Sequence, residues 1–147
     1  MERVMIVGQA GAGQGETAAA VGEALRLPVV DLGHRGERAP REVVEGGRWV
    51  VAGGDPAGWP ARLGRADALV WLDLPVLPRL LRLARGGAEV DALRAALAGR
   101  KAGRARCAAL HAVAGPEHRL FHLRSERARR GFLHALRHAA RTGALPR

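Results

Sequence analysis

The segment that most constrains the fold is rich in glycine and lies near the start of the chain. A short apolar run from Val4 to Val7 leads into the stretch from Gly8 to Gly15, which contains four glycines, and an alanine-rich segment follows from Thr17 to Leu25. An apolar run, a glycine-dense turn and a helical stretch predict a strand, a loop and a helix in that order. This unit predicts an α/β protein in which the loop amides gather at a helix N-terminus.

Three further apolar runs predict strands, at residues 27–31, 49–52 and 68–73, and residues 118–123 are expected to form a fifth strand. Short apolar strands that alternate with helical segments are typical of a parallel sheet covered on both faces. The chain has 147 residues and no obvious linker, which is the size of one compact domain. We therefore expect a single α/β domain over residues 1–147 with a parallel five-stranded sheet.

The second half of the chain is predicted to be mostly helical. Residues 77–84 place four apolar side chains on one helical face, and Arg79, Arg82 and Arg85 recur on another. Two more helices are expected at 91–98 and 102–113. A last helix is predicted to start after the N-cap Ser125. Its inward face is expected to hold Ala128, Phe132, Ala135, Leu136 and Ala139, and its outer face Arg127, Arg130, His134, Arg137 and Arg141.

The glycine-rich loop has the spacing of a phosphate-binding motif but lacks two of its side chains. Gly8 and Gly13 are separated as in the Walker A loop, whose backbone amides bind phosphate oxygens. An active loop continues with lysine, which bridges the β- and γ-phosphates, and with serine or threonine, which holds magnesium. Gln14 and Gly15 occupy these positions. Gln14 donates only a neutral hydrogen bond, and Glu16 adds a negative charge that repels phosphate.

The loop therefore predicts a nucleotide or phosphate ligand held mainly by backbone amides. ATP is the candidate cofactor, and Mg²⁺ is a second candidate that the missing hydroxyl weakens, because Thr17 supplies a hydroxyl only if the loop shifts. No resident metal site is predicted. The residues predicted to bind the ligand are Gly8, Ala10, Gly11, Ala12, Gly13, Gln14, Gly15, Glu16 and Thr17.

Residues 3–13, 48–54, 65–75 and 118–125 resemble the adenylate-kinase-related P-loop proteins that are often labelled DNA topology modulation proteins. The resemblance covers most of the chain. It implies the P-loop NTPase fold of nucleoside kinases, with a shortened helical lid over about 86–116. It also implies transfer of the γ-phosphoryl group of ATP to a small acceptor.

Within this resemblance four residues are candidates for chemistry. Asp73, in the family-like stretch Leu72-Asp-Leu-Pro75, is either a magnesium-organising carboxylate or a cap for the next helix. Asp31 ends the second strand, where it either contacts an acceptor or closes a turn. Arg82 and Arg85 match the family's arginine pair, and they either clamp phosphates or lie on a solvated helix face.

The departures from the family fall on functional positions. Gln14 and Gly15 replace the loop's lysine and hydroxyl, and Ala52 and Gly54 stand where the third strand usually ends in Asp and Asn. Four losses in two motifs are hard to reconcile with ordinary phosphoryl transfer. We infer a kinase-like scaffold whose kinase activity is impaired or lost.

The distribution of charge favours a second class of function. Residues 1–73 carry 8 basic and 10 acidic side chains, net −2, whereas residues 74–147 carry 16 and 4, net +12. A basic half suits a non-enzymatic protein that binds nucleic acid or an acidic protein partner. The cations are almost all arginines, since Lys101 is the sole lysine.

Other motifs are weaker. Gly13-x-Gly15-x-x-Ala18 with Asp31 fits a dinucleotide fingerprint, but it lies too far beyond the first strand. The lone Cys107 excludes an internal disulfide and is expected to pack in a helix. No apolar run is long enough to span a membrane, so a cytoplasmic protein is expected, and its oligomeric state is not predicted. Histidines four residues apart are interpreted as surface side chains, namely His118 with His122 and His134 with His138.

Overall fold

The computed structural model describes residues 1–33 and 40–144, and it contains one parallel five-stranded sheet. The strand order is β2-β3-β1-β4-β5, so the first strand is central. Every neighbouring pair is parallel. The prediction of a parallel five-stranded sheet is therefore confirmed. The strands are β1 (Arg3–Gly8), β2 (Val29–Asp31), β3 (Trp49–Ala52), β4 (Ala68–Leu72) and β5 (Arg119–Leu123).

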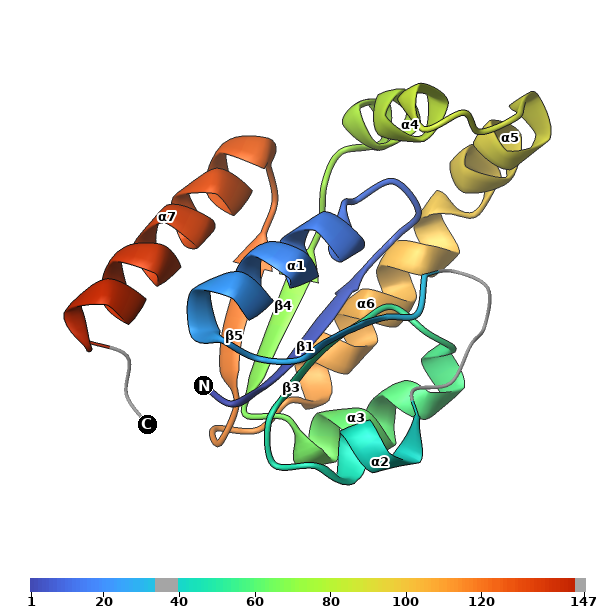
Figure 1. Cartoon of the computed structure of the whole chain (residues 1–147). Helices are drawn as coiled ribbons and strands as arrows, with labels where there is room; N and C mark the ends of the chain where they lie inside the picture. The colour runs from blue at the N-terminus through green and yellow to red at the C-terminus, as the bar shows by residue number, and fades with distance from the viewer. Residues whose placement is uncertain (34–39, 145–147) are drawn as a thin grey trace.

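Helices cover both faces of this sheet, as Figure 1 shows. Helices α1 and α7 lie on one face, and α3 and α6 on the other. Helices α4 and α5 stand beyond the carboxyl ends of the strands, next to the loop between β1 and α1. The helices are α1 (Gln14–Leu25), α2 (Arg41–Glu45), α3 (Trp59–Arg65), α4 (Val76–Arg85), α5 (Val90–Ala98), α6 (Arg100–Val113) and α7 (Glu126–Thr142), with a short 3-10 turn η1 (Pro56–Gly58).

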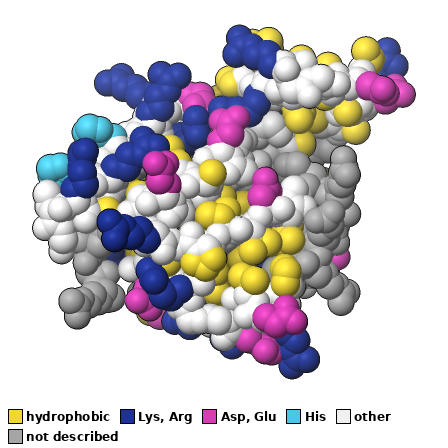
Figure 2. Space-filling model, viewed as in Figure 1, with side chains coloured by type: hydrophobic (Ala, Val, Ile, Leu, Met, Phe, Trp, Pro, Cys, Tyr) yellow, Lys and Arg dark blue, Asp and Glu magenta, His cyan; other side chains and the backbone are white. Residues whose placement is uncertain are grey.

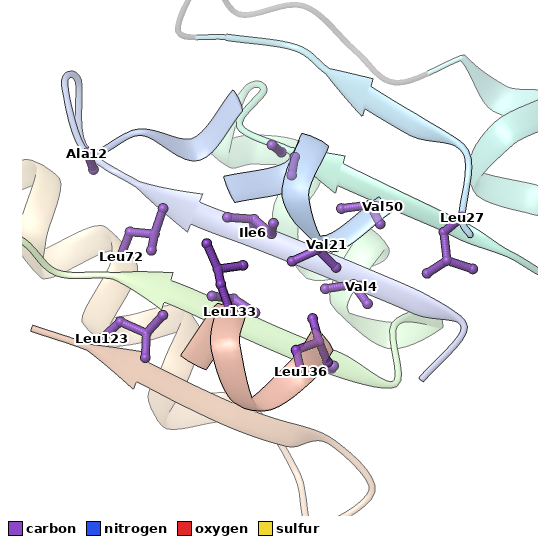
Figure 3. Close-up of a cluster of buried hydrophobic side chains, with 14 of the residues drawn as sticks. Val4, Ile6, Ala12, Val21, Leu27, Val50, Leu72, Leu123, Leu133 and Leu136 are labelled. Atoms are coloured by element: carbon purple, nitrogen blue, oxygen red, sulfur yellow. The ribbon is translucent and has the colours of Figure 1, made fainter. Parts of the chain in front are cut away.

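Two clusters of buried side chains form the core because β1 sends alternate residues to opposite faces. Val4 and Ile6 pack with side chains from α1 and α7, as Figure 3 shows, while Met5 and Val7 pack with α3 and α6. Every residue of β3 and β4 is buried, as expected for strands covered on both faces. The central strand therefore holds the glycine-rich loop on a rigid base.

Helix α7 confirms its predicted start but corrects one part of its predicted inner face. The Ser125 side chain accepts a hydrogen bond of 3.0 Å from the Ala128 amide, which is the expected N-cap. The fully buried side chains are Leu133 and Leu136, and Ala135, predicted to face inward, is exposed. Ala135 directly precedes Leu136, and neighbouring residues on a helix point about 100° apart, so both cannot face the sheet.

Helix α4 turns its most apolar face outward. Leu77 and Leu81 are 64% and 48% exposed, whereas Arg79 is only 2% exposed. The segment 86–116, expected as a lid, forms α5 and α6. Helix α5 buries none of its residues, but α6 packs on the sheet through Cys107 and Leu110. Only the α5 half of this segment thus stands clear of the core.

None of the helices within the described residues is long and apolar enough to cross a membrane.

Candidate phosphate-binding site

The loop between β1 and α1 has the backbone conformation of an anion-binding nest. Gly11 and Gly13 both adopt the left-handed conformation, each with φ of 80°. The Ala12 amide donates to the Gln9 carbonyl at 3.0 Å, but the amides of Gly11, Gly13 and Gly15 donate to no other group among the described residues. Alternating left-handed and right-handed residues at a helix N-terminus gather unpaired amides around one point. The loop therefore offers backbone donors to an anion.

Two arginines of α4 hold the other side of this loop. Arg79 donates from Nε to the Leu74 carbonyl at 3.2 Å and from Nη1 to the Ala10 carbonyl at 3.3 Å. Arg82 donates from Nη1 to the Gly11 carbonyl at 3.0 Å. Because burial disfavours the charged form, the pKa of Arg79 lies below its usual value, although Asp73 opposes that shift. Because both arginines bind carbonyl groups of the loop, the loop amides remain available for a ligand.

Arg82 also joins α4 to the starts of α1 and α7. Its guanidinium forms an ion pair with Glu126 and lies 4.0 Å from the Glu16 carboxylate. Arg129 completes this network by donating to Glu126 at 3.1 Å and to the Thr17 hydroxyl at 3.3 Å. Burial raises the pKa of Glu126, but hydrogen bonds from the two arginines outweigh it and leave that pKa below its usual value. Glu126 is thus an anion that helps to fix the cations around the loop.

The positions of the missing lysine and hydroxyl are filled in two different ways. The Gln14 side chain is buried and donates from Nε2 to the Gln9 carbonyl at 3.2 Å, so it is turned into the loop. A Cβ atom on Gly15 would lie 2.3 Å from Oδ2 of Asp31. The Asp31 carboxylate therefore occupies the space that a serine or threonine side chain would need. Its Oδ1 accepts from the Gly33 amide at 3.0 Å, so Asp31 closes the turn after β2.

Asp73, directly after β4, is engaged by two cationic or polar partners. Arg104 donates to both carboxylate oxygens, at 3.1 and 3.0 Å, and Nε2 of His122 lies 2.8 Å from Oδ2. The His122 ring stacks on Trp71 at 3.9 Å between ring centroids. Burial raises the pKa of Asp73, but the hydrogen bonds from His122 and Arg104 outweigh it and place the pKa below its usual value. Asp73 is therefore a carboxylate held in a fixed arrangement.

These surroundings do not fit the magnesium ion that the resemblance to P-loop kinases implies. The hydroxyl position carries glycine, and both oxygens of Asp73 are already in hydrogen bonds. Magnesium requires near-octahedral oxygen ligands, usually carboxylate or hydroxyl groups with waters. Across residues 1–33 and 40–144, no three His, Cys, Asp or Glu side chains are grouped so that they could hold a metal ion.

Three cavities lie at or near the loop. One of about 630 Å³ lies between α4 and the first turns of α1 and α7, and Arg85 lines it without reaching the loop. A second, of about 490 Å³, lies beside Asp73 and is lined by Arg79, Arg100, Lys101, Arg104 and Arg124.

The third cavity, of about 420 Å³, lies between the loop, the residues after β3, and helices α5 and α6. Cys107 lines it, and burial raises the pKa of this thiol to about 11, so the thiol is not a nucleophile near neutral pH.

Sequence patterns pointed to only part of this arrangement. Of the four candidates, Arg82 contacts the loop, Asp31 lies against it at Gly15, Asp73 is paired with Arg104 and His122, and Arg85 only lines a cavity. Arg79 belongs to the same row of arginines on α4, but the family-like spacing singles out only Arg82 and Arg85. Arg104, Glu126 and Arg129 carry no local sequence signal. His122, interpreted from the sequence as a surface side chain, is instead partly buried against Trp71 and contacts Asp73.

Comparison with solved structures identifies the fold. Shikimate kinase from Acinetobacter baumannii, in complex with shikimate, matches with a TM-score of 0.64 and 16% identity, over 99% of this chain and 96% of that chain. An unliganded sugar kinase from Janibacter sp. matches with a TM-score of 0.52 and 15% identity, over 97% and 93% of the two chains. No model of a protein family and no curated protein matches the sequence. The chain therefore has the fold of the P-loop kinases.

Proposed function

We propose that this protein binds a nucleotide or another phosphate compound at the loop from Gly8 to Gly15, on a kinase-like scaffold whose phosphoryl-transfer activity is impaired or lost. The observation that carries the proposal is the loop itself, with Gly11 and Gly13 in the left-handed conformation and amides available at the start of α1. Arg79 and Arg82 support it by fixing the loop from behind.

ATP is the proposed ligand. Its phosphates would lie on the loop amides, and the cavity of about 630 Å³ beside Arg82 and Arg85 has room for the nucleoside. The side chains that normally handle charge during transfer are replaced by Gln14 and Gly15, so binding is expected without efficient catalysis. The closer resemblance to the DNA topology modulation proteins, a single domain over residues 1–147 and a cytoplasmic location remain parts of this proposal.

Calorimetric titration with ATP tests the proposal. Gly13→Asp places a carboxylate on the loop beside the Arg82 guanidinium, where it repels phosphate, and is expected to weaken ATP binding by at least about tenfold. Gly143→Asp is the matched control, because Gly143 is also left-handed, with φ of 68°, but lies at the far end of α7. Absence of ATP binding to the unaltered protein, or equal binding by both variants, would overturn the proposal.

A second candidate is a non-enzymatic protein that binds nucleic acid or an acidic protein through α7. The observation that favours it is the row of exposed side chains on this helix, spanning about 21 Å by the helical rise. Figure 2 shows Arg and His side chains gathered over α7. Binding to duplex DNA should then weaken steeply as salt is raised, and a flat salt response would exclude it. The row consists of Arg127, Arg130, His134, Arg137 and Arg141.

A further inference from the structure

We propose that this site binds its phosphate ligand without a divalent cation, and that arginine side chains supply the positive charge that Mg²⁺ carries in an active kinase. This inference rests on the proposed function, since it describes the chemical form of the ligand that the same loop accepts. The ligand class is a nucleotide or polyphosphate that is free of metal.

The first observation concerns the place where a P-loop hydroxyl would meet the metal. Gly15 has no side chain, and the space beside it holds the Asp31 carboxylate, with Oδ2 2.3 Å from an added Cβ. Thr17, the next hydroxyl along the helix, is fully buried and accepts a hydrogen bond from Arg129 at 3.3 Å. The described residues therefore present no hydroxyl ligand to a metal at the loop.

The second observation concerns the carboxylate after β4. Arg104 contacts both oxygens of Asp73, and His122 contacts one of them from β5. The Asp73 side chain is 8% exposed. The Arg104 guanidinium also lies 5.6 Å from the centre of the Trp71 ring. A metal would have to displace a bidentate arginine, which is among the stronger polar contacts in proteins.

The third observation is a supply of cations at the same place. The cavity of about 490 Å³ beside Asp73 reaches Gln9 of the loop and is lined by five cationic side chains. Lys101 and Arg124 are exposed and form no ion pair with another described residue. Free ATP is more negative than its magnesium complex, so this surface attracts the metal-free nucleotide more strongly.

The test compares ATP affinity of the unaltered protein in excess EDTA with that in excess Mg²⁺, by calorimetry. The inference predicts that Mg²⁺ raises the Kd for ATP or leaves it unchanged, and that any decrease in Kd is smaller than about twofold. Tightening by Mg²⁺ of more than about twofold would overturn the inference while leaving the proposed function intact. Absence of binding in both solutions would overturn the proposed function and the inference with it.

A variant of Asp73 tests whether this carboxylate binds a metal or only adds a negative charge beside the cations. Asp73→Asn removes a negative charge beside the cations, so ATP in Mg²⁺ is expected to bind as well as before or more tightly. Asp91→Asn, on the exposed face of α5, is the matched control for the change in net charge. Loss of Mg²⁺-dependent affinity in Asp73→Asn alone would assign a metal to this carboxylate and overturn the inference. The comparison of EDTA with Mg²⁺ on the unaltered protein decides the question even if this variant fails to fold.

Discussion

Alanine at Gly11 is expected to destabilise the protein because the loop is pressed against the backbone of α4. A Cβ atom at this position would lie 2.3 Å from the Arg79 carbonyl oxygen and 2.9 Å from the Leu83 Cγ atom. A backbone oxygen cannot move aside without a shift of the whole helix. The left-handed conformation costs an alanine about 1–2 kcal/mol, and overpacking adds about 1–3 kcal/mol. The sum is about 2–5 kcal/mol of unfolding free energy.

Gly13→Ala provides the matched comparison. Its φ is also 80°, but the nearest atoms to an added Cβ belong to the Arg82 guanidinium, at 3.2 Å. The end of a long side chain can move, so mainly the conformational cost of about 1–2 kcal/mol remains. Urea unfolding of both variants measures the difference, which corresponds to a midpoint about 1 M lower for Gly11→Ala at ordinary denaturant slopes. Equal midpoints would refute the close packing of loop and helix.

Two more substitutions test the site. Gly15→Ser should lower the unfolding free energy by about 1–3 kcal/mol because its side chain meets the Asp31 carboxylate, and thermal unfolding measures this loss. In calorimetry, Gln14→Lys combined with Gly15→Ser should strengthen ATP binding only when Asp31 is also changed to alanine. Stronger ATP binding by the double variant that keeps Asp31 would argue against this overlap. The lowered pKa of Asp73 means that its contribution to stability is present above the ordinary value of 3.8 and is lost as pH falls through the folded value. In urea unfolding, the stability of Asp73→Asn should fall less steeply than that of the unaltered protein as the pH decreases below about 5. An equally steep fall would contradict the pairing of Asp73 with Arg104 and His122.

The sheet and the loop could be predicted from the sequence because both follow from local patterns. The three inner strands β1, β3 and β4 are short apolar runs, and a run of buried residues is how a parallel strand covered on both faces reads in a sequence. The edge strands β2 and β5 are less buried. The glycine-rich loop is equally local, since the positive φ angles at Gly11 and Gly13 require residues without a Cβ atom. The N-cap at Ser125 could also be predicted, because its side chain bonds to an amide only three residues away.

The orientation of α4 could not be predicted. Its leucines form the obvious apolar face, yet Leu77 points to solvent and Arg79 is buried. The reason lies in another part of the chain, where the Ala10 and Gly11 carbonyls need donors that α4 supplies. Hydrophobic periodicity predicts the apolar and polar faces of a helix, but it does not predict which polar groups of other segments the helix will contact.

The pairing of Asp73 with Arg104 depends in the same way on residues far apart in the sequence. The two partners are 31 positions apart and meet only because α6 returns across the carboxyl end of β4. The sequence contains many arginines, so no pattern singles out Arg104 as the one that reaches Asp73. Long-range contacts of this kind decided which candidate side chains face the loop.

Amide chemical shifts of the isotope-labelled protein during titration with ATP test the central claim most directly. If the loop binds phosphate, the amide signals of Gly11, Gly13 and Gly15 should shift most, because hydrogen bonds to phosphate oxygens form at those groups. Adenosine, which lacks phosphates, should leave these three signals in place. Loop signals that stay unmoved at millimolar ATP, or that shift equally with adenosine, would contradict a phosphate site at the start of α1.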